Sequence, residues 1–100
     1  MSHGVLTIFT IKSELKDEFN DFMKGENGLR KTRGWPGCRE ITVGYGGEDN
    51  NVMHIWERWV SKSDWEAYFA WRGETGFAEL AEKFFAGPPA FHHAAIDGSL

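Results

Sequence analysis

The chain has 100 residues and a mass of 11.4 kDa, the size of one small domain, and we expect residues 1–100 to form a single domain. A composition of 41% hydrophobic and 26% charged residues excludes a disordered or collagen-like chain. The net charge of −4, with scattered Lys and Arg residues, argues against a nucleic-acid-binding protein, which needs a basic surface for phosphates.

The first predicted element is a β-strand over residues 5–11, which are mostly β-branched or aromatic. Apolar residues fall on both of its faces, so it is predicted to be a central strand. A helix is then predicted to begin after Ser13, its N-cap, and to end by Gly34, because Pro36 disfavours the helical conformation just before it. Its apolar stripe consists of Leu15, Phe19, Phe22 and Met23.

The middle of the chain has the pattern of a β-hairpin. Residues 39–45 and 52–60 alternate between apolar and polar side chains, and residues 46–51 are rich in turn-forming types. Ser61 and Asp64 then have the form of a capping box, which predicts the start of a second helix.

The last third of the chain is predicted to hold more helix and a final strand. The second helix carries an apolar stripe that includes Trp65 and Tyr68, and we expect Gly73 and Gly76 to break it. A further helix is predicted over residues 77–85, a stop at residues 87–89 (Gly-Pro-Pro), and a short strand over residues 91–96.

The resulting order, β-α-β-β-α-β, is that of a ferredoxin-like α+β fold with both helices on one face of a four-stranded antiparallel sheet. The other face is left uncovered. Ile41, Val43 and Tyr45 form an apolar row on the second strand that needs cover, so we expect a homodimer in which a second copy of the chain packs against the bare face.

Two clusters combine charges with aromatic rings. On the third strand His54, Trp56 and Arg58 share one face, while Glu57 and Trp59 lie on the other. A buried Glu57 needs a partner, for which Arg39 on the neighbouring strand is one candidate, and Trp59 is wide enough to form a cavity wall. Equally, both residues have an ordinary structural interpretation as a paired charge and a core ring.

The second cluster lies on the second predicted helix. Tyr68 and Arg72 share a stripe with Trp71 at its edge, and a guanidinium at the rim of an aromatic cavity can hold a carboxylate or a phenolate. Core packing is the commoner role of such a stripe.

Other chemistries find little support in the sequence. A glycine-rich phosphate-binding loop is followed by a helix, but the glycines near residue 46 are followed by a predicted strand, so such a loop is not expected here. His92 and His93 are adjacent on a strand and point to opposite faces, so they do not chelate one metal ion. Cys38 is the single cysteine, which indicates a reducing compartment, and with no apolar stretch long enough to span a bilayer we expect a cytoplasmic protein.

The chain resembles the antibiotic biosynthesis monooxygenase family of dimeric α+β barrels over nearly its whole length. The resemblance is carried in order by residues 34–38 (Gly-Trp-Pro-Gly-Cys), residues 57–61 (Glu-Arg-Trp-Val-Ser) with the helix start at 64–67, and residues 87–89. It implies a homodimer with a cavity between sheet and helices in each subunit. It also implies, in some members, oxidation of phenols or quinols without a metal or flavin cofactor.

Within that resemblance, Tyr68 and His54 are the candidate catalytic groups, and Arg72 is the candidate clamp for an anionic oxygen. Trp59, Trp71, Trp56 and Phe9 are the candidate substrate-binding residues. The family's usual helix histidine is replaced here by Tyr68. The alternative function is that of a non-enzymatic homodimer that binds an apolar, fatty-acid-like ligand with Arg72 or Arg58 at its carboxylate. A third possibility is a structural or regulatory dimer without a cavity, in which the aromatic side chains form the hydrophobic core and the dimer interface.

Overall fold

A four-stranded antiparallel sheet organises the protein. The computed structural model describes residues 1–99, and the strands are β1 (Ser2–Thr10), β2 (Cys38–Gly46), β3 (Val52–Trp59) and β4 (Ala90–Ile96). Their order across the sheet is β2-β3-β1-β4, so β1 is a central strand, as its two apolar faces predict. The sheet is that of the ferredoxin-like α+β fold.

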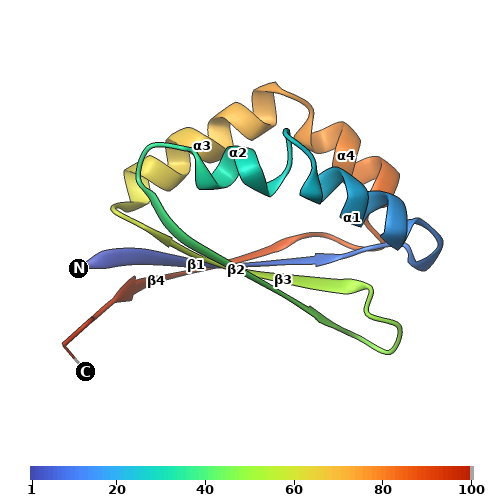
Figure 1. Ribbon diagram of the computed structural model, residues 1–100, viewed down its shortest axis with the longest axis horizontal. Coiled ribbons are helices and arrows are strands. Elements are labelled where there is room, and N and C mark those ends of the chain that lie inside the picture. The colour runs from blue at the N-terminus through green and yellow to red at the C-terminus, as the bar shows by residue number, and fades with distance from the viewer. Residues whose placement is uncertain (100) are drawn as a thin grey trace.

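All helices lie on the same face of the sheet (Figure 1). They are the 3-10 turn η1 (Ser13–Leu15), α1 (Lys16–Lys24), α2 (Leu29–Arg33), α3 (Lys62–Glu74) and α4 (Phe77–Phe84). Among residues 1–99, each helix is too short or too polar to cross a membrane.

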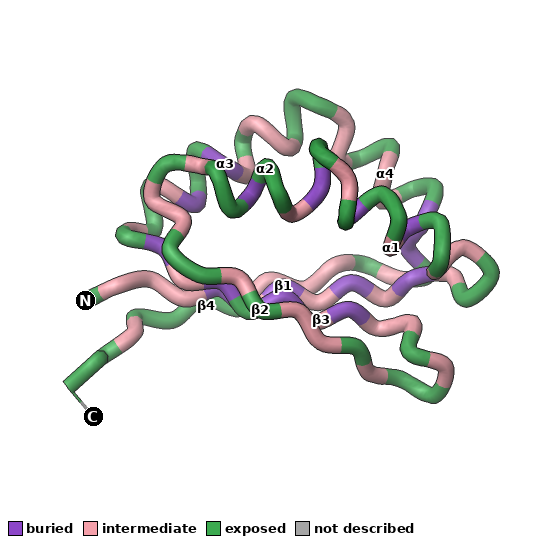
Figure 2. Tube along the Cα trace, in the orientation of Figure 1, coloured by how far each residue is buried: buried purple, intermediate pink, exposed green. Residues whose placement is uncertain are grey.

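Burial alternates along the two central strands because successive side chains point to opposite faces (Figure 2). Val5, Thr7 and Phe9 of β1 are buried beneath the helices, and so are alternate residues of β3. The buried set of β3 consists of Met53, Ile55, Glu57 and Trp59. The helical side is therefore where the core lies.

Two helix boundaries differ from the sequence-based expectation. Ser13 makes no capping hydrogen bond, because it starts a 3-10 turn and α1 begins only at Lys16. Gly73 lies inside α3, where a glycine costs only about 1 kcal/mol. The chain turns instead at Gly76, whose φ of 110° is in the left-handed region that favours glycine.

The apolar row of β2 does not face away from the helices. Ile41, Val43 and Tyr45 are paired across from Glu57, Ile55 and Met53, and Ile41 and Val43 pack against the core. The expectation that this row lies on the bare face and needs a second copy of the chain to cover it is wrong for Ile41 and Val43, which the core covers, while Tyr45 at the end of the row is 48% exposed. The open face instead presents Leu6, Ile8 and Trp56, and Trp56 is 47% exposed.

Candidate functional site

A cavity of about 80 Å³ lies between the sheet and the helices. Its floor comes from β1, β3 and β4, and its walls come from α1 and α3 and from the start of α2 and α4. Apolar residues dominate the lining, among them Phe9, Phe22, Met23, Leu29, Ile55, Trp65, Phe69, Phe77, Leu80 and Phe91. Thr75 and Gly76, at the junction of α3 and α4, also line it. Such a lining suits an apolar or aromatic ligand.

Glu57 places a carboxyl group on the floor of this cavity and is only 8% exposed. Its Oε1 accepts a hydrogen bond of 2.9 Å from Trp59 Nε1, and its Oε2 accepts one of 3.3 Å from Thr7 Oγ1. Burial raises the pKa of the Glu57 carboxyl above its ordinary value, and these two bonds and the charge of Arg72 act in the opposite direction. The group is therefore suited to exchange a proton nearer neutral pH.

Tyr68 and Arg72 form a hydrogen-bonded pair on the helical wall of the cavity. Arg72 Nε donates to Tyr68 Oη at 2.8 Å, and Tyr68 Oη shares a 2.8 Å hydrogen bond with Thr32 Oγ1. Burial raises the pKa of the Tyr68 hydroxyl, which the charge of Arg72 opposes. At neutral pH Tyr68 is therefore a hydrogen-bond donor and not a base.

Arg72 also ties α3 to the segment between α1 and α2. Its Nη1 donates to the carbonyl oxygen of Asn27 at 2.6 Å, and its Nη2 donates to that of Gly28 at 2.9 Å and to Thr32 Oγ1 at 3.0 Å. The guanidinium is thus already bonded on three sides, which leaves little of it to clamp a ligand carboxylate.

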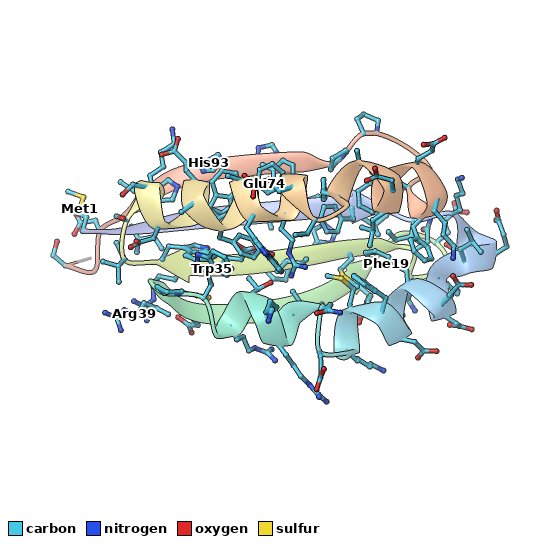
Figure 3. All side chains as sticks on the ribbon, turned by 90° about the horizontal axis from the view of Figure 1, so that it is seen from above. Met1, Phe19, Trp35, Arg39, Glu74 and His93 are labelled. Carbon is cyan, nitrogen blue, oxygen red and sulfur yellow. The ribbon has the colours of Figure 1, made fainter. Side chains whose placement is uncertain are left out.

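The structure brings Phe9, Tyr68 and Arg72 to one cavity, but not the other residues selected from the sequence. Trp59 is 0% exposed and does not line the cavity, and its ring centroid lies 5.2 Å from that of Tyr68. Trp71 stands outside the lining and packs against Trp35, which lies between α2 and α3 in Figure 3.

His54 and Trp56 lie on the open face of the sheet, opposite to the cavity. Their rings stack with centroids 5.7 Å apart. On the same face Arg58 pairs with Glu40 at 3.1 Å, and both side chains are largely exposed. Because the sheet separates His54 from Tyr68 and Arg72, these predicted site residues do not act on one ligand within a single subunit.

Glu57 lines the cavity, although the sequence did not predict it as a site residue. Its partners are Thr7 and Trp59, not Arg39 as one interpretation had it. The signal was present in the alternation of β3, where Glu57 is the one acidic residue on a face otherwise formed by Met53, Ile55 and Trp59. Thr32 carried no such signal, because only the tertiary fold brings it to Tyr68.

Other reactive groups do not assemble into a site in the described part of the chain. Across residues 1–99, no three His, Cys, Asp or Glu side chains converge as metal ligands would. Burial raises the pKa of the Cys38 thiol, with the neighbouring charge of Glu57 acting in the same direction, so the reactive thiolate is disfavoured.

Comparison with known proteins shows similarity in structure. No protein-family model matches the sequence, and no curated protein matches it significantly. A conserved protein from Methanosarcina mazei is 17% identical with a TM-score of 0.78, covering 94% of this chain and 91% of its own. The ActVA-Orf6 monooxygenase of Streptomyces coelicolor, solved with nanaomycin D, is 16% identical with a TM-score of 0.72, covering 99% and 90%.

A third similar structure is that of a putative antibiotic biosynthesis monooxygenase from Chloroflexus aurantiacus. It is 15% identical with a TM-score of 0.74, and the match covers 100% of this chain and 97% of its own. At these identities the likeness concerns the fold. The resemblance noted in the sequence thus extends to three dimensions: the chain has the ferredoxin-like α+β fold of the antibiotic biosynthesis monooxygenases.

Proposed function

We propose that the protein is a monooxygenase-like enzyme that oxidises a small phenol or quinol with O₂ in the cavity between sheet and helices. The observation that carries the proposal is a cavity lined mainly by aromatic and aliphatic side chains, with the Tyr68–Arg72 pair on one wall. The fold shared with the ActVA-Orf6 monooxygenase supports it.

The reaction makes modest demands on the protein. An electron-rich phenol that has lost its hydroxyl proton donates an electron to O₂, and the two radicals combine at the para carbon. Loss of water then gives a quinone, so that a phenol with a free para position plus O₂ yields a para-quinone plus H₂O. The protein has to bind the ring, accept the proton and exclude solvent.

The residues of the cavity supply two of these roles. Phe9, Phe69 and Phe77 provide apolar contact with the ring. The Tyr68 hydroxyl, polarised by Arg72, donates a hydrogen bond to the phenolate oxygen as negative charge develops there. Because the cavity has a volume of only about 80 Å³, we propose that the substrate has a single ring.

Oxygen consumption tests this function directly. Purified, metal-free protein is given a panel of single-ring phenols with a free para carbon, such as phenol and its ortho-alkyl and ortho-methoxy derivatives, in an oxygen electrode, and we expect consumption above the buffer rate for at least one of them. Tyr68→Phe should lower that rate about 100-fold, because it removes a donor to the developing charge. Rates that equal the buffer rate across the panel would rule out the proposed function.

The alternative, a carrier of a fatty-acid-like ligand, is supported by the apolar lining alone. Against it, Arg72 already bonds to Tyr68, Thr32 and two backbone carbonyl oxygens, which leaves little of its guanidinium to bind a carboxylate. Mass spectrometry of the denatured protein distinguishes the two, because a carrier is expected to release a co-purified lipid.

We further propose that the protein is a homodimer formed by the open face of the sheet. The proposal is supported by the apolar side chains at the middle of that face, Leu6, Ile8 and Trp56, the last of which is 47% exposed. A patch of this kind on one protomer is covered by the same patch on a second in a two-fold dimer.

A further inference from the structure

We infer that Glu57 is the group that accepts the hydroxyl proton of the substrate, and that it makes the cavity select neutral phenols over apolar rings of the same shape. The inference rests on the proposed function, because it concerns the ligand of the same cavity.

The geometry leaves Glu57 able to take a further hydrogen bond. Each of its carboxylate oxygens accepts one bond, from Trp59 Nε1 or from Thr7 Oγ1, and each has a second lone pair available. The two bonds fix the carboxylate on the cavity floor. A phenol in the cavity is thus presented with a buried and oriented acceptor.

The other candidates for a proton acceptor are unsuitable. The Tyr68 hydroxyl is bonded to Arg72 and Thr32, and burial raises its pKa, so it is protonated at neutral pH. His54 lies on the opposite face of the sheet, stacked on Trp56. Apart from Tyr68 and Arg72, Glu57 is the one titratable residue that lines the cavity in the described part of the chain.

The charged and titratable groups that interact with Glu57 come from two elements. Arg72 and Tyr68 extend from α3, and Cys38 lies on the neighbouring strand β2. Of these Arg72 alone is charged at neutral pH. Its positive charge offsets part of the cost of an ionised Glu57, so that the carboxylate form is accessible when the ligand binds.

The proton balance of the step is simple. The O–H bond of the phenol breaks, and its proton forms a new bond to a carboxylate oxygen of Glu57. The phenolate left behind gives its electrons to O₂. After the peroxide forms at the para carbon, the hydrogen on that carbon is lost as a proton, and its electron pair forms the second carbonyl group as the O–O bond breaks. The outer oxygen leaves as water with this proton and the one held by Glu57, which returns Glu57 to its ionised state.

The test compares two ligands that differ in one group. 4-Methoxyphenol and 4-methylanisole have the same shape, with a hydroxyl in one and a methyl in the other. Their affinities are measured by calorimetry from about pH 5 to pH 8, where the phenol stays neutral. The wild type should prefer the phenol, and this preference should rise about tenfold as Glu57 ionises, because a hydrogen bond to a charged group is stronger.

Glu57→Gln should remove the pH dependence of this preference. Glu74→Gln is the matched control, because Glu74 is an exposed residue of α3 outside the cavity lining (Figure 3) and its substitution makes the same change of charge. It should leave the wild-type behaviour unchanged. A Glu57→Gln protein that keeps the pH-dependent preference would overturn the inference.

Thr7→Val gives a second variant that keeps the carboxyl group. It removes one hydrogen bond that lowers the pKa of Glu57, so the pH at which the preference appears should move upward. An unchanged midpoint in a folded Thr7→Val protein would contradict the assignment to Glu57.

The outcomes separate this inference from the proposed function. A pH-dependent preference without oxygen consumption would support Glu57 as the phenol-binding group and refute the oxidation. Oxygen consumption at an equal rate in wild type and Glu57→Gln would support the oxidation and overturn the role of Glu57. No binding of either ligand to the wild type would overturn both.

Discussion

Glu57 links the stability of the protein to pH, because it is a carboxyl group buried among apolar side chains. Its pKa is raised in the folded state above the value of about 4.5 in the unfolded chain. The folded protein therefore binds more protons than the unfolded chain between these two pKa values, and the free energy of unfolding falls as the pH rises through that window.

This yields a prediction for Glu57→Gln, which removes the titrating group. We expect the difference in unfolding free energy, wild type minus variant, to decrease as the pH is raised from about 4.5 and to level off above the folded pKa. Urea denaturation at a series of pH values measures this difference. A difference that grows with pH would mean that the pKa of Glu57 is lowered on folding.

At the residue scale, the sequence predicted which residues share a face of an element better than it predicted their contacts. The spacing of Tyr68 and Arg72 predicted that they lie on one helical stripe, and in the structure they are hydrogen-bonded. The placement of Trp59 and Trp71 was not predictable, because ring packing between helices depends on tertiary contacts. The same holds for Thr32, which reaches Tyr68 from another helix.

At the scale of elements, α3 depends on its first residues to position Tyr68 and Arg72. Ser61 is the N-cap, and its Oγ accepts a hydrogen bond of 3.2 Å from the backbone N–H of Asp64. Ser61→Ala should lower the free energy of unfolding by about 1 kcal/mol. Ser63→Ala, one position into the first turn of the helix, should have a smaller effect in the same denaturation experiment, and equal losses would contradict the cap.

Local sequence signals predicted some element boundaries and not others. The Ser61 cap and the turn at Gly76 follow from chemistry within a few residues, and the structure has both. Gly73 was expected to break α3 but is helical, since the helical conformation is open to glycine at modest cost. Ser13 has the residue type of a cap, but the chain first forms a 3-10 turn there.

At the scale of the whole molecule, the sheet separates two surfaces with different expected roles (Figure 1). The helical side encloses the cavity, and the open side carries the proposed dimer contact. The order of elements allowed the uncovered face to be predicted, but the apolar residues on it are Leu6, Ile8 and Trp56 rather than the row on β2. Alternation along a strand does not by itself tell which of its faces the helices cover.

The proposed dimer gives a prediction about Trp56. In analytical ultracentrifugation the wild type should sediment with about twice the chain mass of 11.4 kDa, and Trp56→Glu should sediment as a monomer. A charge at the centre of the contact is costly to bury, while in the monomer this side chain is 47% exposed. A wild type that remains monomeric at micromolar concentration would refute the dimer.

The fate of molecular oxygen tests the central claim, oxidation of a phenol within the cavity, most directly. The purified protein is incubated under ¹⁸O₂ with the phenol that gives the fastest oxygen consumption, and the quinone product is analysed by mass spectrometry. The account predicts one ¹⁸O atom in each product molecule, in excess over the reaction without protein. A product whose new oxygen comes from water, or no product beyond the protein-free reaction, would contradict it.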